Sequence, residues 1–145
     1  AALRNNIRPV LCIGETIQER TDGETAAVLH DQLVGGLANV TSDEVPDVVV
    51  AYEPVWAIGT GENAKPHDVL QAIKSIRRHI SHLYGASVAE NVSILYGGSV
   101  TSESAADYLA IDGIGGLLIG GASLDEFAFA DIVTKAHRKR EVAKR

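Results

Sequence analysis

A single carboxylate, Glu53, stands where an apolar run ends and a proline follows. Residues 48–52 read Val-Val-Val-Ala-Tyr, and Pro54 comes directly after Glu53. An acid at such a point is costly to bury unless it is used or paired. Two interpretations stay open, namely an ion pair with a nearby arginine, or a general base held in an apolar site.

Two Gly-Gly pairs follow later apolar runs: Gly97-Gly98 after residues 92–96, and Gly120-Gly121 after residues 117–119. Glycine lets backbone N–H groups approach a ligand without interference from a Cβ. N–H groups ahead of a helix N-terminus form an anion site that suits phosphate. One such pair is explained by a tight turn, but two on successive strands favour a phosphate site.

The segment after the carboxylate is rich in glycine. Gly59, Gly61 and Ala64 formally match the loose dinucleotide fingerprint, but the first glycine of that motif should follow its strand directly, and here it does not. The segment predicts a mobile lid instead, with Gly59 and Gly61 in its tip. Pro54 and Trp56 form one hinge, and Ala64 forms the other. A nucleotide P-loop is excluded because the sequence contains no Gly-Lys-Ser/Thr.

The other chemistry-bearing side chains favour structural roles. All the histidines fall in predicted helices, and the closely spaced His79 and His82 have no Cys or acid to complete a metal site. Cys12, the one cysteine, is expected in the core, and it excludes a disulfide framework. Ser99 has no neighbouring histidine, so we expect its backbone N–H to matter more than its hydroxyl. Neither a metal nor a cofactor is predicted.

Strand and helix alternate four times along the chain. Apolar runs predict strands over residues 9–13, 48–52, 92–96 and 117–119, of the kind buried on both faces of a parallel sheet. Helical spacing predicts helices over residues 24–37, 66–84, 101–109 and from 124 to near the C-terminus. Thr101 or Ser102 would cap the third of these helices. The positions expected to face inward on the second and fourth are Val69, Ile73, Ile76, Ile80 and Leu83, and Phe129, Ile132, Val133 and Ala136.

This alternation predicts an α/β fold with parallel strands covered by helices, in one unit covering residues 1–145. Two architectures compete: a small open doubly wound sheet, and a (βα)4 half of a (βα)8 barrel, which takes about 250 residues in full. The net charge of −6 argues against a nucleic-acid partner. No apolar run approaches the roughly 20 residues of a membrane span, and no signal peptide is recognised. These features predict a cytoplasmic protein, and the absence of an initial Met allows a piece of a longer chain.

Residues 51–61, Ala51-Tyr-Glu-Pro-Val-Trp-Ala-Ile-Gly-Thr-Gly61, resemble the signature of the triosephosphate isomerase family. Three further blocks fall in the family's order and are similar to its fifth, seventh and eighth strands: Val10-Leu-Cys-Ile-Gly-Glu15, Tyr96-Gly-Gly-Ser-Val100 and Leu118-Ile-Gly-Gly-Ala-Ser-Leu124. The resemblance covers essentially the whole chain but only the last four of eight strands. It therefore implies the C-terminal half of a TIM barrel.

The resemblance also implies an activity, the interconversion of dihydroxyacetone phosphate and glyceraldehyde 3-phosphate through an enediolate, without cofactor or metal. Glu53 matches the base that moves the proton. Leu118 matches an apolar residue that desolvates this base, and Tyr96 and Ser99 match residues that hold the lid closed. The backbone positions that match phosphate ligands are Gly59, Ser99, Gly120 and Gly121.

The departures from the family concern the lid and the missing half. The second hinge reads Glu62-Asn63-Ala64 where the family usually begins with Lys, and Gly115-Gly116 replaces an Asp-Gly. The family's catalytic Lys and Asn of the first strand and its electrophilic His of the fourth have no counterpart. Three hypotheses follow: a split enzyme completed by an N-terminal half, a fragment of an ordinary isomerase, and a non-catalytic homo-oligomer of half-barrels that binds phosphate ligands.

Overall fold

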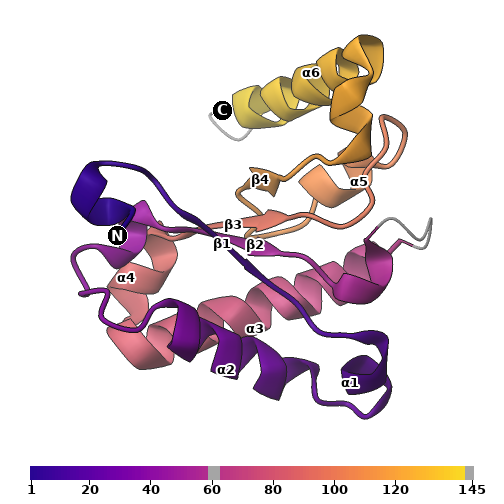
Figure 1. Cartoon of the computed structure of the whole chain (residues 1–145). Helices are drawn as coiled ribbons and strands as arrows, with labels where there is room; N and C mark the ends of the chain where they lie inside the picture. Colours follow the sequence, from indigo (N-terminus) through magenta and orange to yellow (C-terminus); the bar gives the residue numbers. More distant parts are fainter. Residues whose placement is uncertain (59–62, 143–145) are drawn as a thin grey trace.

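The computed structural model, which describes residues 1–58 and 63–142, contains one four-stranded parallel sheet (Figure 1). Its strands are β1 (Val10–Ile13), β2 (Val49–Tyr52), β3 (Ser93–Tyr96) and β4 (Gly116–Leu117). They lie in the order β1-β2-β3-β4, so each strand pairs with the next one along the chain. A doubly wound sheet reverses its strand order at a switch point, whereas strands of a (βα)8 barrel follow one another in sequence. The order therefore fits the half-barrel.

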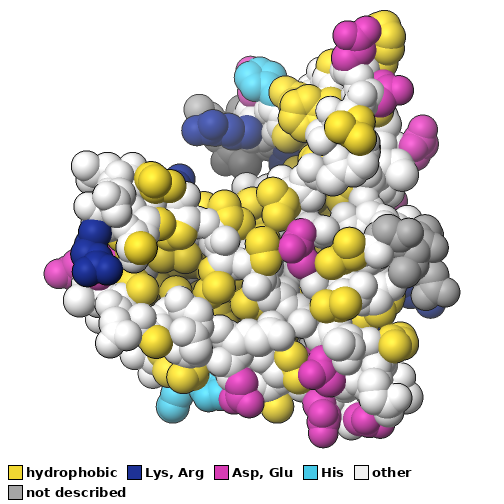
Figure 2. Space-filling view, in the orientation of Figure 1, with side chains coloured by type: hydrophobic (Ala, Val, Ile, Leu, Met, Phe, Trp, Pro, Cys, Tyr) yellow, Lys and Arg dark blue, Asp and Glu magenta, His cyan; other side chains and the backbone are white. Residues whose placement is uncertain are grey.

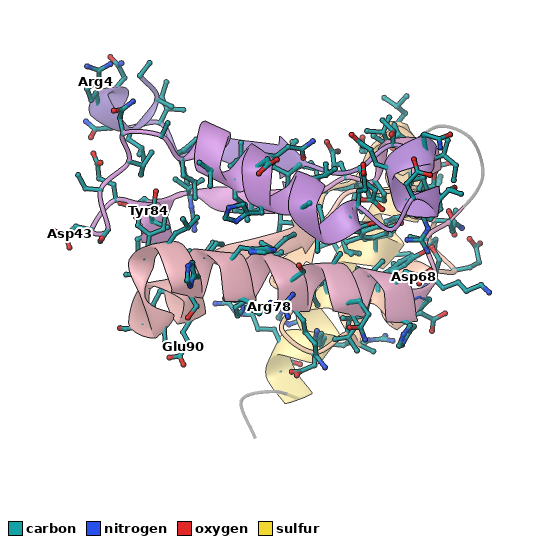
Figure 3. All side chains as sticks on the ribbon, turned by 90° about the horizontal axis from the view of Figure 1, so that it is seen from below. Arg4, Asp43, Asp68, Arg78, Tyr84 and Glu90 are labelled. Atoms are coloured by element: carbon teal, nitrogen blue, oxygen red, sulfur yellow. The ribbon has the colours of Figure 1, made fainter. Side chains whose placement is uncertain are left out.

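The helices alternate with the strands as predicted. In the described residues they are α1 (Ile17–Thr21), α2 (Thr25–Gly36), α3 (Pro66–Tyr84), α4 (Ala86–Asn91), α5 (Ala105–Leu109) and α6 (Glu126–Val142), with the 3-10 turns η1 (Leu3–Asn5), η2 (Val45–Asp47), η3 (Val55–Ala57) and η4 (Gly121–Leu124). Helices α2 and α3 run side by side beneath the sheet, as Figure 3 shows from below. Helix α6 stands beyond β4 (Figure 1).

Alternation along the strands divides their side chains between two faces. Leu11 packs against α2, because a Cβ on Gly36 would meet its methyl carbons. The alternate residue Cys12 therefore points to the opposite face, where it is exposed. Figure 2 shows a hollow on this side of the molecule, with many hydrophobic side chains along its floor. Cys12 is exposed on this face, and not buried in the core as predicted, because nothing in the described chain covers this face of β1.

The core lies between the sheet and helices α2 and α3. Leu29 and Leu33 of α2 are buried, as are the predicted Val69, Ile73, Ile76 and Ile80 of α3. Leu83 departs from the prediction and is 38% exposed, because it belongs to the last turn of α3. The next residue but one, Gly85, has φ 94°, a conformation that suits glycine and ends the helix.

Helix α6 differs most from the prediction. Of the expected inward positions, Ile132 is buried and Ala136 is half-buried, but Phe129 and Val133 are 42% and 51% exposed. The reason is that α6 packs mainly against α5 and η4. Its apolar surface is thus only partly used by the described chain.

Three local predictions also need correction. Helix α4 was not expected, because it is a short helix without an apolar periodicity. Strand β4 ends at Leu117 instead of 119, although the Leu118 N–H still donates to Tyr96 O at 2.8 Å. Thr101 and Ser104 hydrogen-bond to each other in the turn before α5, so no side chain caps that helix. In the described ranges no helix is both long and apolar enough to cross a membrane.

Candidate active site at the carboxyl ends of the strands

Glu53 lies at the rim of the sheet, immediately after β2. Its N–H donates to Ile13 O at 2.8 Å, and the Gly97 N–H donates to Tyr52 O at 2.9 Å. These bonds continue the sheet's hydrogen bonding beyond the strands and set Glu53 between Gly14 and Gly97. The residue is half-buried and makes no ion pair with any other described residue. The arginine-pair interpretation therefore finds no support among the described residues.

Glycine is required on both sides of Glu53. A Cβ on Gly97 would come within 2.6 Å of Glu53 Cγ and 2.8 Å of Oε1. A Cβ on Gly14 would come within 2.0 Å of Glu53 O. All three distances are shorter than contacts between non-bonded heavy atoms allow. The carboxylate side chain and its own peptide therefore each lie directly against a glycine.

Cys12 contacts Glu53 from the neighbouring strand. Burial raises the pKa of the Cys12 thiol, and a hydrogen bond with Glu53 and the negative charge of that carboxylate raise it further. Because Cys12 is exposed on the face of the sheet opposite α2, this contact brings the Glu53 carboxylate to the same face, on the side of the hollow. A general base there is open to a ligand held in the hollow.

A second carboxylate at the rim, Glu15, was not predicted to matter. It is fully buried and accepts hydrogen bonds from Tyr52 OH at 3.1 Å and from Trp56 Nε1 at 3.1 Å. Burial raises the pKa of the Tyr52 hydroxyl, and the charge of Glu15 adds to the effect. The signal for Glu15 was its position just after the first strand, equivalent to that of Glu53 after the second.

Arg20 completes the surroundings of Glu15. Its guanidinium lies 3.8 Å from Glu15 Oε1 and 2.9 Å from Asp68 Oδ2, at the labelled end of α3 in Figure 3. It also lies 4.6 Å from the centre of the Trp56 ring, close enough for a cation–π contact. The structure thus places Trp56, with Pro54 at the start of η3, on a polar cluster formed by buried Glu15 and the partly exposed Arg20 and Asp68. This arrangement fixes the first predicted hinge.

The second predicted hinge is held by tyrosines. Tyr108 OH donates to Ala64 O at 2.9 Å, and Ala64 is fully buried. The Tyr96 ring lies 4.5 Å from that of Tyr108, and burial raises the pKa of the Tyr96 hydroxyl. Ser99 reaches the first hinge, where its Oγ donates to Ala57 O at 2.8 Å. The predicted lid supports therefore contact both ends of the segment, while the tip with Gly59 lies outside the described residues.

The two Gly-Gly turns differ in their surroundings. A Cβ on Gly98 would lie 2.1 Å from the Tyr96 hydroxyl, so tight packing explains the first turn. A Cβ on Gly120 or Gly121 would meet no atom within 4 Å. Gly121 begins η4, and both residues are exposed beside the half-buried Leu118. Open space at this second turn is what a ligand-binding role for its backbone requires.

The histidines lie in helices, as predicted, but they pair differently. His79 of α3 packs against His30 of α2, with ring centres 5.0 Å apart, and not with His82. Desolvation lowers the pKa of His79, and the positive field of His30 adds to this effect. The described residues contain no group of three or more His, Cys, Asp or Glu side chains placed to hold a metal ion.

Consecutive parallel strands with a carboxylate and exposed glycines at their carboxyl ends match half of a (βα)8 barrel. The family model described as triosephosphate isomerase matches residues 1–136. The chain therefore belongs to the triosephosphate isomerase family.

Curated relatives agree with this assignment. The chain is 46% identical over 140 residues to the triosephosphate isomerase of Symbiobacterium thermophilum, covering 97% of this chain and 55% of the relative. It is 48% identical over 138 residues to that of Chlamydia abortus, covering 95% and 54%. It is 45% identical over 133 residues to that of Caldanaerobacter subterraneus subsp. tengcongensis, covering 92% and 54%. The chain spans about half the length of the curated relatives it matches.

Proposed function

We propose that this chain supplies the C-terminal half of a triosephosphate isomerase, which interconverts dihydroxyacetone phosphate and D-glyceraldehyde 3-phosphate. The observation that carries the proposal is the placement of Glu53. Its carboxylate contacts Cys12 on the hollow side of the sheet and lies against Gly97. A carboxylate so placed can reach a substrate in the hollow while its backbone stays fixed by the sheet.

The reaction moves one proton between adjacent carbons of the triose phosphate. Glu53 would accept the proton from the carbon beside the carbonyl, which leaves an enediolate. Glu53 would then return the proton to the former carbonyl carbon. A second proton would pass from the hydroxyl oxygen to the former carbonyl oxygen, so the carbonyl changes place and no atom is gained or lost. Leu118, half-buried at the rim, would exclude water from the base. The chemistry calls for no cofactor and no metal.

The substrate phosphate would bind to backbone N–H groups. Gly120 and Gly121 offer unobstructed space at the start of η4, and the backbone N–H of Ser99 would add a further donor. Gly59 would add its N–H from the lid. Pro54, Trp56 and Ala64 would serve as hinges, supported by Tyr96. Closing the lid would exclude water and so strengthen every electrostatic interaction in the site.

The N-terminal half of a barrel would complete the site, whether it is carried on the same polypeptide or on a separate one. It would supply the Lys, Asn and His that stabilise the enediolate. Leu124 of η4 and Phe127 of α6, the elements that follow β4, are 90% and 80% exposed, and Val10 of β1 is 47% exposed. Apolar surface at both sheet edges supports a partner that closes the barrel. The lone cysteine supports a cytoplasmic setting for this assembly.

The test combines native mass with activity. The chain is mixed with the N-terminal half of a relative's barrel, and we expect a one-to-one complex with isomerase activity. Glu53→Gln in that complex should lower kcat by about 10²–10⁴-fold, whereas Glu90→Gln, a matched change at an exposed glutamate of α4, should not. Assembly only into multiples of 15.3 kDa, without turnover, would contradict the proposal and favour a phosphate-binding homo-oligomer.

A further inference from the structure

Gly14 occupies a special place in the hydrogen-bonding pattern of the rim. The residue before it, Ile13, accepts the Glu53 N–H, and the residue after it, Glu15, accepts the Val55 N–H through its backbone oxygen at 3.0 Å. In a parallel ladder, alternate residues bond to opposite neighbours. The N–H and C=O of Gly14 therefore turn away from β2, toward a side on which no strand of the described chain lies.

Both polar groups of Gly14 are satisfied by one side chain. The Gly14 N–H donates to Gln32 Oε1 at 2.8 Å, and Gln32 Nε2 donates to Gly14 O at 3.1 Å. The carboxamide of Gln32 thus acts as a strand neighbour would, with one donor and one acceptor in a fixed geometry. Gln32 lies in α2. The next residue, Leu33, is buried and anchors this helix on the core.

The peptide held by Gln32 lies directly on the peptide that carries Glu53. An added Cβ on Gly14 would be 2.0 Å from Glu53 O, 2.4 Å from Glu53 C and 2.9 Å from Pro54 N. All three are backbone atoms, which cannot rotate away as the end of a side chain can. A shift of Gly14 would therefore shift the backbone that aims Glu53.

We propose that Gln32 is a positioning residue for Glu53, acting through the two hydrogen bonds that fix Gly14 against the Glu53–Pro54 peptide. Gln32 would not touch substrate. The catalytic part of this proposal rests on the proposed function, because it assumes that Glu53 is the base. The geometric part of the proposal, that Gln32 sets the Glu53 backbone, stands apart from any activity.

The geometric part is tested on the full chain by the amide resonances of Gly14 and Glu53. Gln32→Ala removes both hydrogen bonds, and we expect both resonances to move. Gln32→Glu keeps an acceptor for the Gly14 N–H but loses the donor, so we expect a smaller change at Glu53. Gln71→Ala, at an exposed glutamine of α3, is the matched control and should move neither. A change confined to Gly14 in Gln32→Ala would overturn the proposal.

The catalytic part is tested in the complex with the N-terminal half. We expect Gln32→Ala to lower kcat by about 10-fold or more, because small misplacements of a catalytic group are costly, while KM changes by less than about two-fold. Gln32→Glu should recover part of the loss. Unchanged kcat in a fully assembled Gln32→Ala complex would overturn the role. If the wild-type complex has no turnover, the proposed function fails. The amide resonances then decide on their own whether Gln32 fixes the backbone position of Glu53.

Discussion

Gly97 lies so close to Glu53 that any side chain at position 97 would displace the carboxylate. The added Cβ would lie 2.6 Å from Cγ and 2.8 Å from Oε1. These are side-chain atoms, so the carboxylate can rotate away without moving the sheet. A larger residue at position 97 should therefore change the orientation of the Glu53 carboxylate more than it changes the stability of the fold.

Gly97→Ala should accordingly separate activity from stability. We expect kcat of the assembled complex to fall by about 10–100-fold, with a much smaller effect on the unfolding of the chain. Steady-state kinetics and urea unfolding measure the two effects. Gly35→Ala in α2, where no atom lies within 4 Å of the added Cβ, is the control and should stabilise the chain by about 0.4–1 kcal/mol. Unchanged kcat for Gly97→Ala would show that the contact does not aim Glu53.

Gly14→Ala should have the opposite balance. Its added Cβ would meet the backbone of Glu53 and Pro54, which can yield only if the strands separate. We expect a loss of about 3 kcal/mol in the free energy of unfolding, at the upper end for overpacking. Urea unfolding followed by circular dichroism gives this value. A loss below about 0.5 kcal/mol would mean that the rim relaxes more easily than the contact implies.

Glu15→Gln should destabilise the chain. The substitution keeps the shape of the side chain but presents an NH₂ group where the carboxylate accepts from Tyr52 and Trp56, and it removes the charge beside Arg20. Leaving a buried donor unsatisfied costs about 1–3 kcal/mol. Urea unfolding measures the loss, and Trp56 fluorescence should change with it. Glu24→Gln, at an exposed position with no side-chain cap hydrogen bond, should change stability by less than about 0.5 kcal/mol.

The His30–His79 contact should make stability depend on pH. Because the pKa of His79 is lowered on folding, the unfolded chain binds a proton more readily than the folded one. The stability that neutral His79 contributes is therefore fully present above the unfolded pKa of about 6.5. It is lost as the pH falls from there through the lower pKa of folded His79. The basic Arg78 and His82 lower the pKa of His79 further, whereas a hydrogen bond with the Ala26 backbone raises it and offsets these effects only in part.

Thermal unfolding at pH 7.5 and pH 5.5 checks this expectation. We expect Tm to be lower at pH 5.5 in the wild-type chain, and the difference to shrink in His79→Phe. His67→Gln, on the same helix but exposed and not among the groups that act on His79, should keep the wild-type difference. An equal pH difference in all three chains would assign the effect to other titrating groups.

Cys12 should react slowly for an exposed thiol. Its raised pKa leaves less thiolate at neutral pH, and the thiolate is the reactive form. Glu53→Gln removes the neighbouring charge, so we expect faster alkylation by iodoacetamide and a lower pKa in the rate–pH profile. The N-terminal half should protect Cys12 by covering the hollow. Equal rates with and without that half would contradict docking on this face.

Much of this architecture was predictable because local patterns specify it. The apolar runs located three strands to within one residue, and the spacing from Val69 to Ile80 identified the buried face of α3. The exposure of Cys12 was not predictable, because an apolar run does not show which face is left uncovered. Helix α4 lacks any periodicity that would predict it.

Some residues of the candidate site were likewise predictable from the sequence, and others were not. Glu53 and the glycine turns stand at strand ends, so the sequence places them on one rim. Gln32 and Glu15 act through contacts with residues 18 and 41 positions away in the sequence, Gly14 and Trp56. Such pairs depend on how a helix lies across the sheet and on strand register. Neither can be read from residue spacing alone.

The sequential strand order also bears on how the molecule forms. Val10 pairs with Val49, and Val49 pairs with Ser93, so each pairing closes a chain segment of about 40 residues. Each strand pairs with the strand that comes next in the sequence, and contacts of modest sequence separation favour rapid folding. We expect the sheet and its helices to assemble as one cooperative unit during synthesis. Closure of a barrel would then be a docking step between two preformed units, and its rate would depend on their concentration if they are separate chains.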